Sequence, residues 1–245
     1  MLPKLNLVRL SAIPILQQLQ WEEALLRTNA ENWCLLNMGS PPAIVMGISG
    51  KAEQLIHFDK LRNMPISLIR RFSGGGTVIV DENTLFVTLI CQSKAIAITP
   101  FPKSIMQWTA DNIYRPLFPS HCFALQENDY ALNDRKWGGN AQSIVKGRWL
   151  HHTSILWDYR EEFMDILAMP PKMPGYRQGR SHKEFLCRLR EIWNDCELLI
   201  ENIVKQLQNT YEIVKKTEND LVEICGQPHR KMTEVIKLKE GNENE

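Results

Sequence analysis

Hydrophobic residues in the first third of the chain follow two different spacings. Between positions 13 and 29 they recur every three to four residues, which predicts a helix with one apolar face. The residues on that face are Ile15, Leu19, Leu25 and Leu26. Apolar runs at 32–38, 43–48, 67–72 and 76–91 lack this period and are bounded by turn residues, which predicts strands.

The rest of the chain continues this mixture. Helical spacing returns at 103–118, and residues 129–159 predict short strands with turns at 133–134 and 146–147. The last third is predicted to be largely helical, and Ser181 with Glu184 is typical of a helix start. Because helices alternate with runs of strands, we expect an α+β fold in which helices pack on a mixed β-sheet.

Composition narrows the class of protein. The 245 residues suffice for one full core, and a formal net charge of +1 gives no reason to expect binding to nucleic acid or a membrane surface. No apolar run approaches the roughly 18 residues that span a bilayer, and the start of the chain lacks the features of a signal peptide. Six scattered cysteines without a CxxC pair predict reduced thiols and a cytoplasmic location, with an organelle matrix as the alternative.

The sequence RRFSGGG at 70–76 places three glycines directly before a predicted strand. Without a Cβ, glycines let a ligand contact the backbone, and such turns can direct several N–H groups at one anion. Arg70 and Arg71 would add charge that suits a phosphate or a carboxylate. The alternative is a flexible hairpin turn with solvated arginines. A Walker loop is excluded because the lysine and hydroxyl residue expected after the glycines are missing.

Two later segments also contain candidate functional residues. In NDRKWGGNAQ at 133–142, Lys136 precedes two glycines and could reach a ligand as a point charge, although a surface turn would explain the same residues. In WLHHTSIL at 149–156, His151 and His152 are neighbours on a predicted strand and would point to opposite faces. That geometry disfavours a zinc site. We expect one histidine at the wall of a site and the other facing outward.

In this order, RRFSGGGTVIVD, ENDYALNDRKWGGNAQ and GRWLHHTSIL resemble the lipoate-protein ligase A family, which shares its catalytic fold with biotin ligases and octanoyltransferases. The family pattern is an Arg-Arg-x-Ser/Thr-Gly-Gly-Gly loop, a Lys-x-x-Gly-x-Ala segment and a His-His-Gly-Thr-Leu segment. The resemblance covers about residues 14–159.

The resemblance implies a lipoate-protein ligase, which uses ATP and Mg²⁺ to convert lipoate to lipoyl-adenylate and transfers the lipoyl group to one lysine of a carrier domain. The implied partners are lipoyl domains of 2-oxoacid dehydrogenase complexes or the H protein of glycine cleavage. No nucleic acid, membrane or permanently bound metal is expected. The protein would exclude water from the lipoyl-adenylate, a mixed anhydride, and align it with the amine of the carrier lysine.

The resemblance also assigns roles to residues. Lys136 would be catalytic, because it would bridge the acyl carbonyl oxygen and the adenylate phosphate. His152 would pack beneath the site, and Val45 and Gly47 would line the dithiolane end. The residues expected along the acyl chain and nucleotide are Arg70, Arg71, Ser73, Gly74, Gly75, Gly76, Val78, Asp81, Asn83, Gly138, Gly139, Asn140 and Ala141.

The sequence departs from the family pattern at three places. Val80 replaces the usual histidine before Asp81, and the DENT segment is one residue shorter than the family's. Thr153 and Ser154 stand where the family has glycine and threonine. These departures bear on which residues contact the nucleotide. They do not change the roles assigned to Lys136 and the three glycines.

We expect a single catalytic domain over 1–237, a flexible tail over 238–245, and no C-terminal accessory domain. The enzyme would then need a separate accessory subunit to make the adenylate, accept a preformed adenylate as lipoyltransferases do, or work unaided. Arg177, Arg180, Arg188 and Arg190 would face an acidic carrier domain, with a solvated helix face as the alternative.

Two other functions stay open. An octanoyltransferase of the same fold would use a cysteine thiolate, and Cys122, upstream of the lysine segment, is the candidate nucleophile, with a structural thiol as the alternative. The second alternative is a domain of this fold that has lost catalysis and serves for binding or assembly. Lys136 and the three glycines argue against it.

Overall fold

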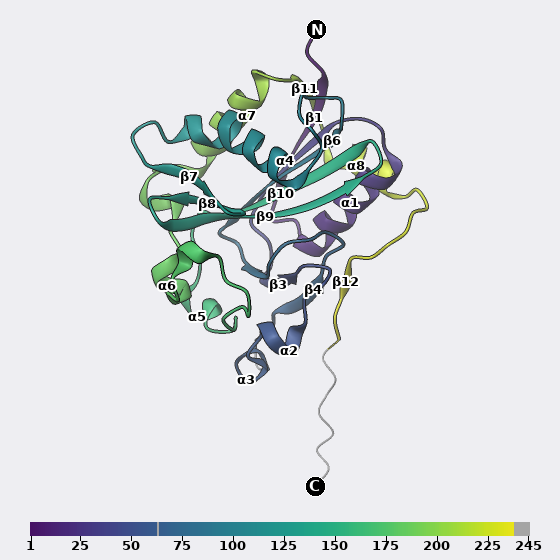
Figure 1. Cartoon of the computed structure of the whole chain (residues 1–245). Coiled ribbons are helices and arrows are strands. Elements are labelled where there is room, and N and C mark those ends of the chain that lie inside the picture. The colour runs from purple at the N-terminus through teal and green to yellow at the C-terminus, as the bar shows by residue number, and fades with distance from the viewer. Residues whose placement is uncertain (63, 238–245) are drawn as a thin grey trace.

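A computed structural model describes residues 1–62 and 64–237, and its largest element is a mixed eight-stranded sheet (Figure 1). The strand order is β11-β1-β2-β6-β10-β9-β8-β7. In chain order the strands are β1 (Lys4–Ser11), β2 (Trp33–Met38), β6 (Thr84–Gln92), β7 (Phe123–Gln126), β8 (Asp129–Leu132), β9 (Arg135–Val145), β10 (Arg148–Leu156) and β11 (Glu212–Lys216). β1 pairs in parallel with β2 and β11, and the remaining neighbours are antiparallel.

Helices cover both faces of this sheet (Figure 1). We call the two sides the α4 face and the α1 face. On β6, Leu85, Val87 and Leu89 belong to the core under the α4 face, whereas Phe86 and Ile90 point to the α1 face. The α4 face is covered by α4 (Pro102–Thr109), a π-helical turn (Ala110–Tyr114), a 3₁₀ turn (Arg115–Leu117) and α7 (Cys196–Gln208), and the α1 face by α1 (Ile15–Thr28) and α8 (Glu218–Cys225).

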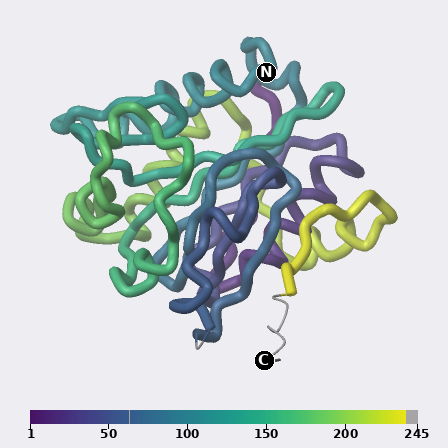
Figure 2. The backbone as a smooth tube through the Cα atoms, turned by 60° about the horizontal axis from the view of Figure 1, so that its bottom comes forward, coloured from purple at the N-terminus to yellow at the C-terminus, as the bar shows by residue number. Residues whose placement is uncertain are grey.

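A small four-stranded sheet lies against the α1 face. Its order is β12-β4-β3-β5, with bounds Glu234–Val235, Ser67–Arg70, Ala43–Met46 and Val78–Val80. Val45 packs with α1 and Phe86, whereas Ile44 and Met46 face a second core formed with α2 (Ala52–Leu55), α3 (Phe58–Leu61) and α5 (Glu161–Met164). Figure 2 shows this region in dark blue, between the green segment that follows β10 and the yellow C-terminal segment.

The α+β prediction is confirmed, and so are the strands on both sides of the three glycines. The prediction of a largely helical last third is partly wrong. Ser181 does form a capping box with Glu184, but α6 spans only His182–Phe185, and Glu212–Lys216 is a strand. Two 3₁₀ turns, Gly175–Arg177 and Leu189–Glu191, complete this part. The tail predicted at 238–245 lies outside the described residues.

None of the described helices combines the length and the apolar character needed to cross a bilayer.

Candidate active site

Arg71 fixes the glycine loop (residues 73–76) from inside the protein. Its buried guanidinium donates to the carbonyl oxygen of Gly76 at 2.7 Å and to those of Val45 and Gly74 at 3.3 Å. Burial lowers the pKa of Arg71 to about 10, against the opposing effect of the Glu22 charge, so the side chain stays charged at neutral pH. Arg71 therefore shapes the loop through its backbone carbonyls.

Gly75 supplies the backbone conformation that this loop requires. Its φ of +122° is one that residues with side chains rarely adopt, and a Cβ there would lie 2.5 Å from Nη2 of Arg71. A Cβ on Gly47 would overlap the carbonyl oxygen of Gly75. The amide of Gly74 donates to the carbonyl oxygen of Gln142 at 3.0 Å in an antiparallel bridge, so the loop runs beside β9 there.

Arg70 lies in a different environment from Arg71. It is the last residue of β4, and its guanidinium forms a 3.1 Å ion pair with Glu234 of β12. Neighbouring strand residues point to opposite sides, so Arg70 faces the C-terminal segment while Arg71 turns under the loop. Arg70 and Arg71, both expected along the acyl chain and nucleotide, therefore lie in different surroundings.

Lys136 lies near the start of β9, and its side chain reaches along the strand. Nζ is 2.8 Å from Oδ1 of Asp129 on β8, and the lysine side chain is 21% exposed. A Cβ on Gly139 would lie 3.2 Å from Nζ, so the glycine leaves room for the ammonium. The hydroxyl of Tyr176 donates to Oδ2 of Asp129 at 3.0 Å. The ammonium is therefore held by an ion pair that solvent can reach.

The lysine and the glycine loop meet along β9. Gly139 pairs with Ser154 of β10, and paired residues direct their side chains to the same face. Because Ser154 faces α1, Nζ of Lys136 also lies on the α1 face. The loop bridges to the strand at Gln142, roughly 10 Å beyond Gly139. The glycine loop and the ammonium therefore lie at two points along one strand, on which Gly139 and Ala141 carry little or no side chain.

Residues 138 to 141, expected along the acyl chain and nucleotide, are divided between two faces of the sheet. Gly138 lies against Tyr130, and the amide oxygen of Asn140 accepts a hydrogen bond from Thr153 at 2.8 Å, both on the α4 face. Only Gly139 and Ala141 of these four turn toward α1, because side chains alternate along a strand.

The remaining residues predicted to contact the ligand lie in the glycine loop, on β5 and in the turn after β5. Ser73 is buried, and its carbonyl oxygen accepts the amide of Ile48. The carboxylate of Asp81 accepts the amide of Asn83 at 2.8 Å in the turn between β5 and β6, and burial raises the pKa of Asp81. Val78 is half-buried on β5. A nucleotide contact at Asp81 or Asn83 stays a prediction.

Both histidines are buried, so the expectation that one faces outward is wrong. His151 points to the α4 face, where Nε2 lies 3.1 Å from the hydroxyl of Tyr130, and burial lowers its pKa to about 3. His152 points to the α1 face, with Nδ1 2.9 Å from Oε1 of Glu22. Adjacent strand residues do face opposite ways, but helices cover both sides of β10.

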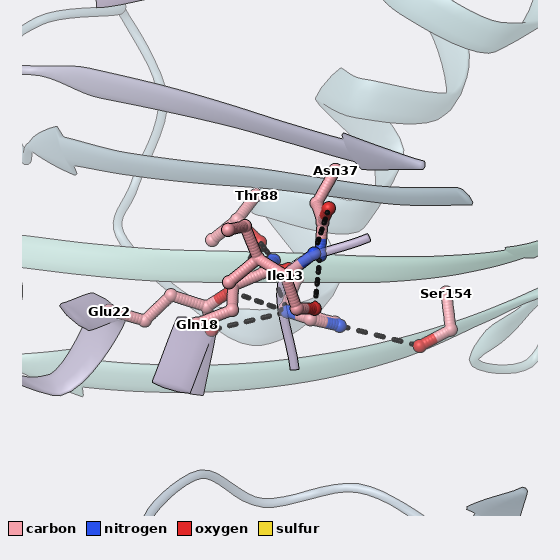
Figure 3. A network of polar contacts seen from close by, with 7 residues as sticks. Ile13, Gln18, Glu22, Asn37, Thr88 and Ser154 are labelled. Carbon is pink, nitrogen blue, oxygen red and sulfur yellow. Dashed lines mark hydrogen bonds and ion pairs between the residues drawn. The ribbon is translucent and has the colours of Figure 1, made fainter. Parts of the chain in front are cut away.

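A buried polar network joins α1 to the large sheet, and sequence reasoning missed it (Figure 3). Oε1 of Glu22 accepts from Gln18 at 2.8 Å, from Thr88 at 2.7 Å and from Nδ1 of His152 at 2.9 Å. The amide of Asn37 donates to Gln18 at 2.9 Å. The available signal was two polar residues, at 18 and 22, spaced one helical turn apart beside the apolar face of the helix.

Cys122 lies away from the glycine loop. The thiol is exposed, and the carbonyl of Cys122 accepts the amide of Asn133 at the start of the β8–β9 turn. Phe123, next to Cys122, pairs with Leu132, which pairs with Arg135 of β9. Arg135 lies roughly 20 Å along β9 from the bridge between Gly74 and Gln142. This distance weighs against Cys122 as the acyl-bearing nucleophile.

The four arginines expected to face a carrier domain are engaged within the chain. Arg177 is buried, which corrects that expectation, and the other three form ion pairs at 2.6–2.8 Å. Those pairs are Arg180–Asp134, Arg188–Asp158 and Arg190–Asp158.

The sequence matches a known protein family. The model of the lipoyl protein ligase A/B catalytic domain matches residues 14–212. The chain belongs to this family. Among curated relatives, inactive lipoate–protein ligase 2 of Plasmodium falciparum is 30% identical over 73% of this chain and 56% of its own length. Octanoyltransferase LipM of Clostridioides difficile is 26% identical over 82% of this chain and 83% of its own length.

Solved structures of the family share the fold. A bipartite lipoate-protein ligase of Thermoplasma acidophilum superimposes with a TM-score of 0.75 at 16% identity, covering 91% of each chain. A lipoate-protein ligase A bound with ATP gives 0.71 at 18% identity, covering 92% and 93%. The chain spans 56% of the Plasmodium relative and 32% of the matched yeast proteins.

Proposed function

We propose that this chain is a lipoate-protein ligase, which activates lipoate with ATP to lipoyl-adenylate and transfers the lipoyl group to a lysine of a lipoyl carrier domain. The observation that carries the proposal is the convergence on one strand of the Lys136 ammonium and a glycine loop fixed by buried Arg71. Membership of the lipoyl ligase family supports it.

In this proposal the ammonium of Lys136 leaves its ion pair with Asp129 and binds the acyl carbonyl oxygen and the adenylate phosphate. There its charge stabilises the tetrahedral oxygen, a contribution of about 3 to 4 kcal/mol for one such donor. The glycine loop lets the acyl chain lie against bare backbone. Mg²⁺ would arrive on the ATP phosphates; within 1–62 and 64–237 no three His, Cys, Asp or Glu side chains group as metal ligands.

A second candidate is a lipoyltransferase that takes a preformed adenylate from a separate subunit. This candidate is supported by the match, over 91% of both chains, with the bipartite lipoate-protein ligase of Thermoplasma acidophilum, which was analysed together with its E2 lipoyl domain. A cysteine-dependent octanoyltransferase is less favoured because Cys122 lies far from the glycine loop, although one relative is an octanoyltransferase.

Mass spectrometry of an apo lipoyl domain separates these activities. The domain is incubated with the pure chain and lipoate, with and without MgATP, and in parallel with synthetic lipoyl-adenylate. A lipoyl mass gain that needs ATP establishes the ligase. Gain from the adenylate alone indicates a transferase that needs a partner. If octanoyl carrier protein is the sole effective donor, the ligase proposal is wrong.

A further inference from the structure

The chain after α8 leads back to the residues that precede the glycine loop. Residues 227–237, which we call the C-terminal strap, run from the end of α8 to β12, and β12 pairs with β4 in antiparallel orientation (Figure 1). The strap lies outside the segment 14–212 that matches the family model. Because β4 ends at Arg70, the strap meets the main chain directly before Arg71 and the glycine loop.

A buried carboxylate on α1 anchors the strap. Glu23 is 1% exposed, and its Oε2 accepts hydrogen bonds from the amides of Met232 and Thr233 at 3.0 Å each and from the hydroxyl of Thr233 at 3.1 Å. Its Oε1 accepts from Nε of Arg27 at 3.0 Å. A buried carboxylate is costly unless it is paired and hydrogen-bonded, and bonds to a charged acceptor are the stronger kind. The strap therefore supplies much of what keeps Glu23 satisfied inside the protein.

On one side of Arg71, the strap holds the end of β4. The amide of Ile236 donates to the carbonyl oxygen of Leu68 at 2.7 Å, and Glu234 forms the 3.1 Å ion pair with Arg70. Among the described strands of the small sheet, β12 is the outermost one next to β4. The strap therefore covers the edge of β4 that β3 leaves open.

On the other side of Arg71, the anchor of the strap contacts Phe72. The guanidinium of Arg27 lies 5.9 Å from the centre of the Phe72 ring, and Nη2 of Arg27 is 3.5 Å from Sδ of Met232. Phe72 is buried, and Met232 packs against the core cluster that contains it. Both residues that flank Arg71 are thus linked to the strap, and Arg71 is the side chain that fixes the glycine loop.

We propose that the C-terminal strap positions the glycine loop for its ligand, with Glu23 as the positioning residue. The strap fixes Arg70 and Phe72, which hold Arg71 where its guanidinium donates to the carbonyl oxygens of the loop. The inference rests on the proposed function for the identity of the ligand, lipoyl-adenylate. A loop already held in its binding conformation costs less to order, so release of the strap should weaken binding and leave the chemistry at Lys136 unchanged.

The test releases the strap in the full chain in two independent ways. Glu23→Gln replaces a carboxylate, which only accepts hydrogen bonds, by an amide with one acceptor oxygen and two N–H donors. Ile236→Pro removes the amide that donates to Leu68 and leaves Glu23 intact. Val235→Pro is the matched control. Hydrogen-bonded and non-hydrogen-bonded pairs alternate along antiparallel strands, so the amide of Val235 points away from β4.

Hydrogen exchange of the unliganded chain is measured first, because it requires no activity. In both strap variants the amides of residues 71–76 should exchange about 10-fold faster than in the parent, and Val235→Pro should match the parent. Asp220→Ala removes the capping box at the start of α8 and controls for a general loss of stability, which thermal melting of every variant measures.

Binding and turnover are then compared. The dissociation constant of a non-hydrolysable sulfamoyl analogue of lipoyl-adenylate should rise by about 3- to 10-fold in the strap variants, in proportion to the loss of the binding-competent loop. The single-turnover rate of transfer from saturating lipoyl-adenylate to a lipoyl domain should stay within about 2-fold of the parent, because Lys136 is untouched.

Three outcomes overturn the inference: unchanged exchange at 71–76 in the strap variants, an equal increase in Asp220→Ala at the same loss of melting temperature, or faster exchange with unchanged binding of the analogue. If Glu23→Gln does not fold, Ile236→Pro decides alone. If the parent itself does not bind the analogue, the ligase proposal is wrong, and the exchange data by themselves decide whether the strap positions the loop.

Discussion

The glycine loop and the lysine end of the site, which consists of Lys136, Asp129 and Tyr176, are held in different ways. The loop is held by one buried guanidinium, which donates to three carbonyl oxygens, and by a backbone hydrogen bond to β9. The lysine end is held by one partly exposed ion pair, which Tyr176 supports through Asp129. Ion pairs in reach of solvent contribute about 0 to 1 kcal/mol, whereas buried charged groups cost several when a partner is removed.

This difference suggests that the glycine loop and the lysine end have separate roles. The loop is preorganised, so it can present backbone to a ligand without rearrangement. The ammonium can leave Asp129 for a ligand oxygen at little cost. Substitutions in the loop should therefore change stability, and substitutions at the lysine end should change rate.

The largest effect is expected from Lys136→Ala. Lipoyl transfer should fall by about 10² to 10³-fold, because the charge at the developing oxyanion is lost. The melting temperature should stay close to that of the parent, since the ion pair with Asp129 is partly exposed. Single-turnover transfer to a lipoyl domain measures the rate, with Lys146→Ala in the exposed β9–β10 turn as control. Normal turnover would contradict the role of Lys136.

Arg71→Met should affect stability most. Three carbonyl oxygens lose the buried guanidinium that donates to them, so we expect the free energy of unfolding to fall by roughly 3 kcal/mol. Arg70→Met breaks only an exposed pair with Glu234 and should cost at most about 1 kcal/mol. Urea denaturation compares the two. Equal losses would remove the distinction between the neighbouring arginines.

His151 should make the protein sensitive to acid. Its pKa falls from 6.5 to about 3 on burial, so between these values the unfolded chain binds a proton that the folded chain does not. Stability conferred by the neutral ring is complete above pH 6.5 and is lost as the pH falls toward 3, with a slope of up to about 1.4 kcal/mol per pH unit. His151→Gln should flatten this slope in urea titrations, and His57→Gln, at an exposed position, should not.

Tyr176→Phe should give the smallest change. It removes one hydrogen bond to Asp129, worth about 1 kcal/mol, and leaves the glycine loop untouched. We expect a few-fold change in transfer rate and an unchanged pattern of hydrogen exchange in residues 70–76. Increased exchange in the loop would show that the two ends of the site are coupled.

The sequence by itself determined the local elements and the chemistry-bearing segments. Alternation and turn residues located the strands around Gly74–Gly76 and the turns at 133–134 and 146–147, because strand period and turn preference are properties of neighbouring residues. It did not reveal Glu212–Lys216 as a strand, since that strand exists by parallel pairing with β1 from the other end of the chain.

Only the tertiary structure decided which side chains share a face. Arg71 lies under the glycine loop while Arg70 does not, and both histidines are buried because helices cover both sides of β10. The partner of His152 is Glu22, 130 residues away in the chain. No local period encodes such a contact, because it arises when a helix packs on a sheet assembled from distant segments.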